Sequence, residues 1–190
     1  MVSTAKSKAA RREARDQSIQ RYRSDRVRNQ ISASPGVHDF IVVLDNLKPG
    51  FNVPKIFRSA EIFGACEVQL INVGPFDPAP AVGAFRRVPA RFYEKFQQSY
   101  EDLTARGYTL LVLEPRSEHT LSHEPLPRKS AFIFGHEERG ISIDREHRAE
   151  ATSSVRVMTS TEGAQRGVRS WRVRRQDGDP ATTTMRSDRA

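Results

Sequence analysis

The chain has 190 residues, which is enough for one ordinary domain with extensions. Its single cysteine, Cys66, excludes an internal disulfide and a multi-cysteine metal site, and we expect it to be a small buried residue. No apolar run is long enough for a secretory signal or a membrane span. The sequence therefore predicts a soluble, cytoplasmic protein without a metal site.

The positive charge is concentrated at the two ends of the chain. Lys and Arg outnumber Asp and Glu by nine to three in residues 1–30 and by eight to four in residues 151–190, but residues 31–150 hold fourteen against sixteen. Basic ends on a near-neutral body are typical of a protein that binds a polyanion, because Lys and Arg release counterions from phosphates. For each end the alternative is a solvated, poorly ordered tail.

Three regions are predicted from this distribution. Residues 1–37 form a basic N-terminal arm and linker, residues 38–158 form the folded domain, and residues 159–190 form a disordered basic tail. The arm favours helix over residues 4–30 but has few large apolar residues, so we expect such a helix to gain little from packing.

The stretch from 52 to 64 organises the domain. Asn52 is predicted to cap a helix that ends at Gly64, between buried strands at residues 40–45 and 68–73. Arg58 lies off the apolar face of this helix. Because a helix that starts beside the carboxyl end of a parallel strand marks the ligand site of many α/β sheets, Asn52 and Arg58 are site candidates. The alternative is an ordinary cap and a surface arginine. The apolar face consists of Val53, Ile56, Phe57, Ala60 and Phe63.

Later elements continue the alternation of helix and strand. A helix is predicted near residues 92–106, followed by strands at 108–113 and 131–134, so the sequence favours a mainly parallel α/β sheet. The last of these strands runs into G-H-E-E-R-G, in which two glycines bracket Glu137, an acceptor for hydroxyl or amino groups. An ordinary acidic turn is the alternative. His136 has no second His or Cys at metal-ligand spacing.

Together the two stretches resemble the SpoU family of SPOUT RNA 2′-O-ribose methyltransferases. The first family motif is matched by Asn52, Arg58 and Phe63-Gly64, and the second, F-G-x-E-x-x-G, is matched by residues 134–140. The resemblance covers about residues 38–156. It implies a parallel sheet with a C-terminal trefoil knot (an α/β knot), S-adenosylmethionine bound in the knot, a homodimer, and tRNA or rRNA as substrate.

The resemblance also implies roles for individual residues. Arg58 is the catalytic residue, held in place by Asn52 and Glu137. We interpret it as an orienter and charge stabiliser, because guanidinium is a poor base, although a role as base stays open. The cofactor cleft is lined by Leu113, Gly135 and Ile141. The basic arm grips RNA phosphates through Arg11, Arg12, Arg15, Arg21 and Arg23.

The sequence departs from the family pattern near its C-terminus. The family's third motif contains S-L-N-V and precedes an apolar helix, and neither is found in residues 159–190. We therefore expect an incomplete knot, weak cofactor binding and no family dimer, and the alternative function is an inactive RNA-binding remnant. A shifted reading frame near residues 155–162 is one hypothesis, because Ala164-Gln165-Arg166-Gly167 read one base later permits Leu-Asn-Val followed by a small residue.

Overall fold

Six parallel strands form one sheet in the spatial order β3-β2-β1-β5-β4-β6. The computed structural model describes residues 2–113, 126–136, 138–142 and 152–155. Strand β1 is central and pairs with β2 on one side and β5 on the other, and every ladder runs parallel. This confirms the predicted mainly parallel α/β sheet, whereas the predicted knot and tail lie outside the described residues. The strands are β1 (His38–Asp45), β2 (Ala65–Ile71), β3 (Ala90–Tyr93), β4 (Thr109–Leu113), β5 (Ser130–Phe134) and β6 (Thr152–Val155).

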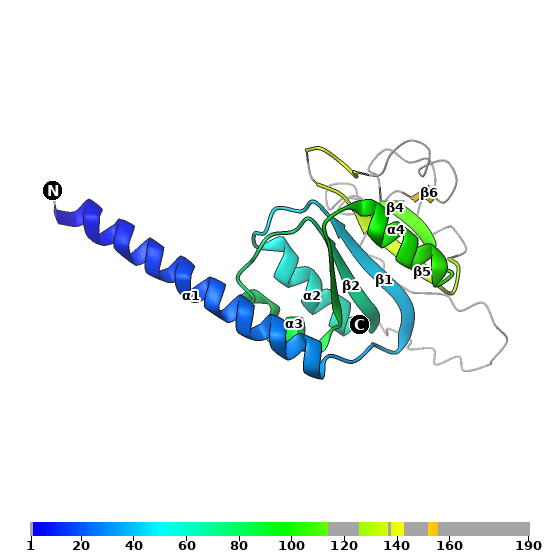
Figure 1. The fold of residues 1–190 in the computed structure, drawn as a ribbon, viewed down its shortest axis with the longest axis horizontal. Helices are drawn as coiled ribbons and strands as arrows, with labels where there is room; N and C mark the ends of the chain where they lie inside the picture. Colours follow the sequence, from blue (N-terminus) through cyan, green and yellow to red (C-terminus); the bar gives the residue numbers. More distant parts are fainter. Residues whose placement is uncertain (1, 114–125, 137, 143–151, 156–190) are drawn as a thin grey trace, which may run out of the picture.

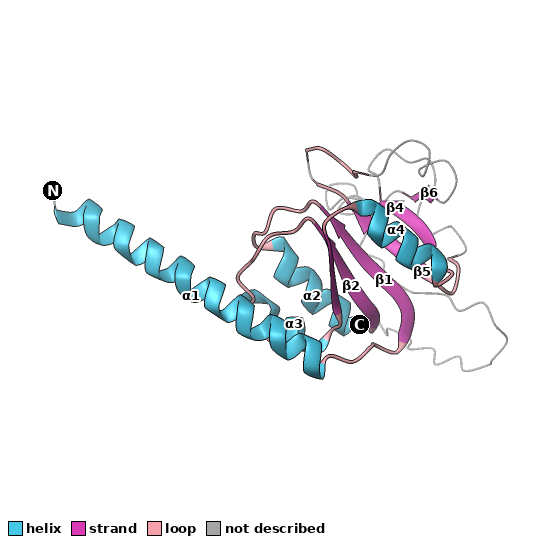
Figure 2. Ribbon diagram, in the orientation of Figure 1, coloured by secondary structure: helices cyan, strands magenta, loops and turns pink. Residues whose placement is uncertain are grey.

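Helices cover both faces of the sheet (Figure 1 and Figure 2). Side chains alternate along β1, so Val42 and Leu44 pack with the helices of one face, and Ile41 and Val43 pack with α4 on the other. Among the described helices, none combines the length and apolar content needed to cross a membrane. The first face carries α1 (Val2–Ser32), α2 (Asn52–Ile62), η1 (Ala79–Ala81) and α3 (Ala84–Arg87), and the second carries α4 (Phe96–Ala105).

Two local predictions need correction. The helix expected from residue 92 begins only at Phe96, because Phe92 belongs to the four-residue edge strand β3, which is too short to show a periodic pattern. Cys66 is half-buried rather than buried, since it lies on the α4 face of β2 next to Tyr108.

The second half of α1 is part of the folded domain, so the expectation that this helix gains little from packing is wrong there. Tyr22 is 5% exposed, with its ring 5.7 Å from that of Phe85 and stacked on it. The buried Asn29 amide donates to the carbonyl oxygens of Phe85 and Val88, each at 2.6 Å, and accepts from the Ala90 amide at 3.2 Å. The first half of α1 projects away from the domain (Figure 1).

An ionic network ties α4 to the sheet. Arg106 donates to the buried Glu67 at 2.7 Å and to Asp102 at 2.8 Å, and Arg91 lies 3.2 Å from Glu67 and 3.3 Å from Asp102. Partial burial acts to raise the pKa of Asp102, but the two arginines outweigh it and hold that pKa below its usual value. The network therefore ties α4 to the edge of the sheet through two arginines shared by Glu67 and Asp102.

Candidate functional site

The direction of the chain across the sheet changes at β1. From β1 the chain adds β2 and β3 on one side and later places β5, β4 and β6 on the other. In open α/β sheets ligands bind outside the carboxyl ends of the strands at such a switch point. The carboxyl ends of β1 and β5 are therefore the expected position of a site.

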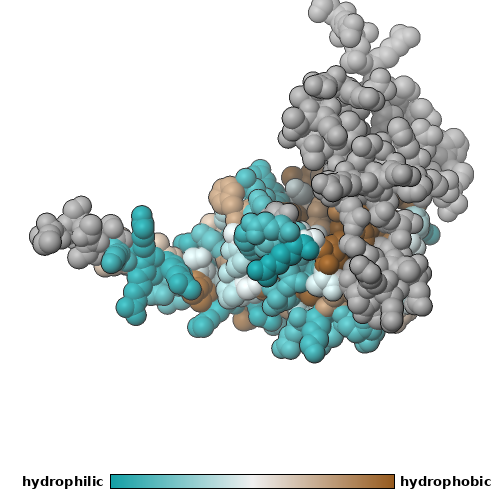
Figure 3. All heavy atoms as spheres, turned by 90° about the horizontal axis from the view of Figure 1, so that it is seen from above, coloured by the Kyte–Doolittle hydropathy of each residue, from teal (hydrophilic) through white to brown (hydrophobic). Residues whose placement is uncertain are grey.

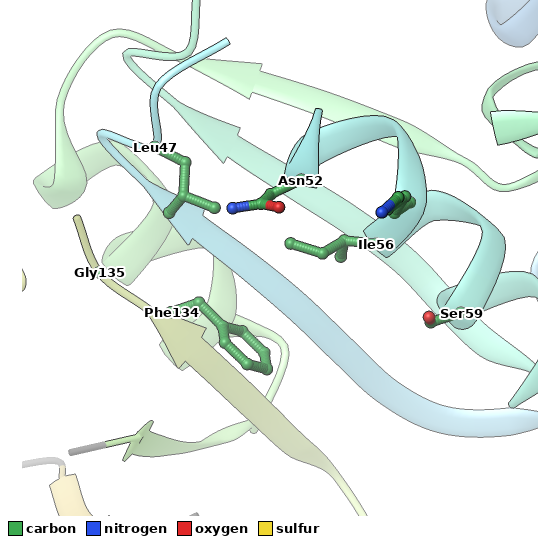
Figure 4. A pocket seen from close by; sticks show the side chains of 7 residues that line it. Leu47, Asn52, Ile56, Ser59, Phe134 and Gly135 are labelled. Carbon is green, nitrogen blue, oxygen red and sulfur yellow. The ribbon is translucent and has the colours of Figure 1, made fainter. Parts of the chain in front are cut away.

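A pocket of about 310 Å³ lies at this position, between α2 and the ends of β1 and β5 (Figure 4). Its volume is at the lower end of the range for small-molecule sites. Asn52 and Ile56 extend from α2 toward the strand ends, where Leu47, Phe134 and Gly135 lie (Figure 4). The lining residues are Leu47, Asn52, Lys55, Ile56, Ser59, Phe134 and Gly135.

The local sequence of α2 explains how it presents a polar face to the pocket. Val53, Phe57 and Ala60 are buried on the opposite face, as predicted. The expected cap at Asn52 is wrong: Phe51 occupies the N-cap position, so Asn52 is the first helical residue and belongs to the pocket wall.

The end of α2 agrees only in part with its apolar pattern. Gly64 has the left-handed φ of 66° expected just after a helix. Phe63 was expected in the buried stripe but is 54% exposed, because the helix ends at Ile62 and Phe63 turns away as the C-cap residue.

The segment after β5 folds back on itself. His136 and Gly140 exchange two backbone hydrogen bonds, of 2.9 Å and 2.8 Å between N and O. A Cβ added to Gly135 would come within 2.5 Å of the Gly140 carbonyl carbon and 2.7 Å of Ile141 Cγ1. Glycine is therefore required at Gly135 for this close approach, and it leaves backbone open to the pocket.

A buried carboxylate fixes this segment to the end of β1. Asp45 is fully buried and accepts hydrogen bonds from the Ser142 amide and, at 2.8 Å, from the Ser142 hydroxyl. Asn46 donates to the same carboxylate at 2.7 Å and accepts from Asn72 at 2.6 Å. Charged hydrogen bonds of this kind are stronger than neutral ones, so the loops at the strand ends are held in one arrangement.

The structure brings some of the predicted site residues together. Asn52 and Gly135 line the same pocket, and Ile141 is beside Gly135. Leu113 ends β4, directly after the Val112–Ile133 pair, so it lies at the same edge of the sheet although it does not line the pocket. Arg58 is exposed on α2 outside the lining, and Glu137 lies outside the described residues. Their roles stay predictions.

Sequence reasoning missed several lining residues. Lys55 and Ser59 follow Asn52 by three and seven residues, which places them on the same side of the helix, and this spacing could have identified them. Phe134 is the first residue of the second motif but was not assigned to the site. Leu47 follows β1, and no local pattern points to it. The Lys55 ammonium lies 4.1 Å from the centre of the Phe51 ring, a cation–π contact at the mouth of the pocket.

The lining combines apolar walls with a few polar groups. Leu47, Ile56 and Phe134 offer surface for an apolar or aromatic ligand, while Asn52 and Lys55 supply an amide and a cation. No group of three His, Cys, Asp or Glu side chains suited to a metal ion occurs among the residues that the structure describes. The pocket therefore suits an organic ligand with a planar part and an anionic or hydroxyl-bearing part.

Comparison with known proteins gives consistent matches. The profile of the SpoU rRNA Methylase family matches residues 39–164. An uncharacterized tRNA/rRNA methyltransferase of Archaeoglobus fulgidus is 32% identical over 108 residues, which are 54% of this chain and 48% of that protein. The chain thus spans about half the length of the curated relative it matches.

Solved structures share the fold. The TrmH/SpoU tRNA modifying enzyme of A. aeolicus has a TM-score of 0.55 at 17% identity, over 72% of this chain and 70% of that one. An AdoMet-bound rRNA methyltransferase from Sinorhizobium meliloti has a TM-score of 0.55 at 19% identity, over 70% of this chain and 51% of that one.

Proposed function

Because this chain belongs to the SpoU rRNA Methylase family, we propose that it transfers a methyl group from S-adenosylmethionine to a ribose 2′-hydroxyl of tRNA or rRNA. One observation carries the proposal. Asn52 and Gly135, which belong to the two separate motif stretches, line a single pocket at the switch point of the sheet. Convergence of distant stretches on one pocket is expected of a functional site and is not needed for the core.

The residues at this edge fit the cofactor. Gly135 has no side chain, so the Gly140–Ile141 segment can pack against it while Gly135 still lines the pocket, and Ile141 and Leu113 add apolar surface beside it. The S. meliloti neighbour is AdoMet-bound. When bound, S-adenosylmethionine supplies a methyl group on a cationic sulfonium. We assign Leu113, Gly135 and Ile141 to holding it.

The side chains of α2 then act on the RNA. A ribose hydroxyl is a weak nucleophile, so the site must orient it and stabilise the negative charge that develops on its oxygen. Asn52 can hydrogen-bond the ribose, and the Lys55 ammonium can bind the adjacent phosphate. Arg58, exposed one helical turn beyond Lys55, is assigned to orienting the ribose and phosphate from the rim. Direct removal of the proton by Arg58 is the alternative role.

Transfer of labelled methyl groups to RNA tests the proposal. The purified protein is incubated with methyl-labelled S-adenosylmethionine and total cellular RNA, and label in the RNA is counted. Arg58→Ala should lose transfer at an unchanged circular dichroism spectrum, because Arg58 is exposed and no core contact is lost. Arg28→Ala, at another exposed position, is the matched control and should keep full transfer. Equal transfer by the two variants would contradict the assignment of Arg58.

The same experiment separates the inactive remnant from the enzyme. A remnant would retard RNA in a gel shift but transfer no label in any RNA fraction. Active transfer by the unmodified protein excludes the remnant.

A further inference from the structure

The face of α1 that packs on the domain continues beyond it. Tyr22 and Asn29, which are the two buried residues in the part of this helix whose side chains the structure describes, are seven residues apart and lie on one side of it. Residues 8–17 are all exposed, and burial begins at Ser18, which lies on the same side. The same spacing of three and four residues can be continued from Ser18 toward the N-terminus. It then places Arg15, Arg11 and Lys8 on this side of the helix.

Charge is segregated around the projecting part of the helix. Lys8, Arg11 and Arg15 share the domain-facing side, whereas Glu13 is two residues from both arginines, about 200° around the helix. Asp16 is about 100° or more away from the same arginines. Lys8, Arg11 and Arg15 therefore form one stripe with Arg12 at its margin, and the carboxylates lie off it. Hydrophilic side chains stand out from this part of α1 in Figure 3.

The contacts of the packed half fix the direction of this stripe. Arg21 pairs with Asp77 at 3.2 Å, and the Arg26 guanidinium lies 4.1 Å from the centre of the Phe92 ring. With the three hydrogen bonds of Asn29, these contacts prevent rotation of α1 about its axis. Residues 2–17 then form an overhang of roughly 24 Å, given a rise of about 1.5 Å per residue.

We propose that Lys8, Arg11 and Arg15 form a binding site for the phosphate backbone of RNA on the inner side of the overhang. The site lies in the angle between α1 and the edge of the domain formed by η1 and α3, and this assignment rests on the proposed function. Asp77 at that edge is neutralised by Arg21, so it does not repel phosphates. Three cations on one face of a helix attract an RNA strand by releasing its counterions.

The assignment differs from that of a diffuse basic arm. A diffuse arm uses every exposed cation, including Arg23 and Arg28, which lie about 100° or more from Tyr22 around the helix and therefore off the stripe. An oriented stripe uses the three on it. It also requires that the helix keep its rotation relative to the domain.

Two variants of equal charge separate these cases. RNA binding of the full chain is measured by fluorescence anisotropy over a series of salt concentrations. In the stripe variant the slope of log K against log salt should fall by about 1.4 to 1.8, because each lost phosphate contact lowers it by about 0.7 to 0.9. In the control variant it should fall by less than about 1. The stripe variant carries Arg11→Gln and Arg15→Gln, and the control carries Arg23→Gln and Arg28→Gln.

Insertions after Gln17 test the rotation without changing charge. Two added alanines turn the overhang by about 200° and should reduce the salt slope as far as the stripe variant does. Seven added alanines restore the face to within about 20° and should recover the slope. The oriented stripe would be overturned if the salt slope fell equally in the stripe and control variants, or if the two-alanine variant bound RNA as the unmodified chain does. Either result would leave the proposed function intact. Absence of RNA binding by the unmodified chain would overturn the function itself.

Discussion

Replacing Asn29 by alanine should destabilise the whole domain. The side chain is 4% exposed and makes three hydrogen bonds to backbone groups of α3 and the segment after it, at 2.6, 2.6 and 3.2 Å. One accepting carbonyl, that of Phe85, belongs to the four-residue helix α3, whose last carbonyls have no partner within so short a helix. At about 1 kcal/mol for each bond, Asn29→Ala should lower the free energy of unfolding by about 3 kcal/mol. For a chain of this size the corresponding fall in Tm is about 6 to 12 °C.

Urea unfolding followed by circular dichroism measures this loss. Gln30→Ala changes the exposed neighbour on the same helix and is the control, with an expected change within about 0.5 kcal/mol. Hydrogen exchange should show faster exchange of the α1 amides in the Asn29→Ala protein. If the two variants unfold at the same urea concentration, α1 is not held by Asn29, and the fixed direction of the arm fails with it.

Three further changes probe the site and the second helical layer. Gly135→Ala places a Cβ 2.5 Å from the Gly140 backbone and should weaken the affinity for S-adenosylmethionine, measured by calorimetry, at least tenfold. Gly50→Ala is the control and should leave the affinity unchanged, because the atom nearest to its added Cβ is 4.0 Å away. Equal affinities of the two variants would contradict the close-approach argument. Ser142→Ala removes the 2.8 Å hydroxyl bond to Asp45 and should cost about 1 to 2 kcal/mol in urea unfolding, and no loss would refute that contribution. The pKa of Asp102 is lowered in the folded state, so the stabilisation that this carboxylate contributes is present above the usual carboxyl pKa of 3.8 and is lost as pH falls through the folded pKa. The Tm of the Asp102→Asn protein should therefore lie below that of wild type near neutral pH and approach it below the folded pKa. A difference in Tm that does not change with pH would contradict the argument.

Features set by local periodicity could be predicted from the sequence. The α2 stretch shows an apolar stripe, a clear C-terminal glycine and flanking apolar strands, and the structure has these elements within a few residues of the predicted bounds. Strands β4 and β5 are short apolar runs and were predicted for the same reason. Such signals lie within a window of about a dozen residues, so they survive without knowledge of tertiary partners.

Features that depend on distant partners could not be predicted. Tyr22 and Asn29 are two residues in a polar helix, and their partners follow more than fifty residues later. The pocket wall at Leu47 and Phe134 exists only because β5 is inserted beside β1, which no local pattern specifies. The Asp45–Ser142 contact likewise joins residues 97 apart in the sequence.

Identification of the methylated nucleoside tests the central claim most directly. RNA methylated in vitro by the purified protein is digested to nucleosides and examined by mass spectrometry, with fragmentation that separates base from ribose. The proposed function predicts the added methyl on the ribose fragment of one nucleoside, and its absence from RNA treated with the Arg58→Ala protein. A methyl group on a base, or none on any RNA in the presence of S-adenosylmethionine, would contradict it.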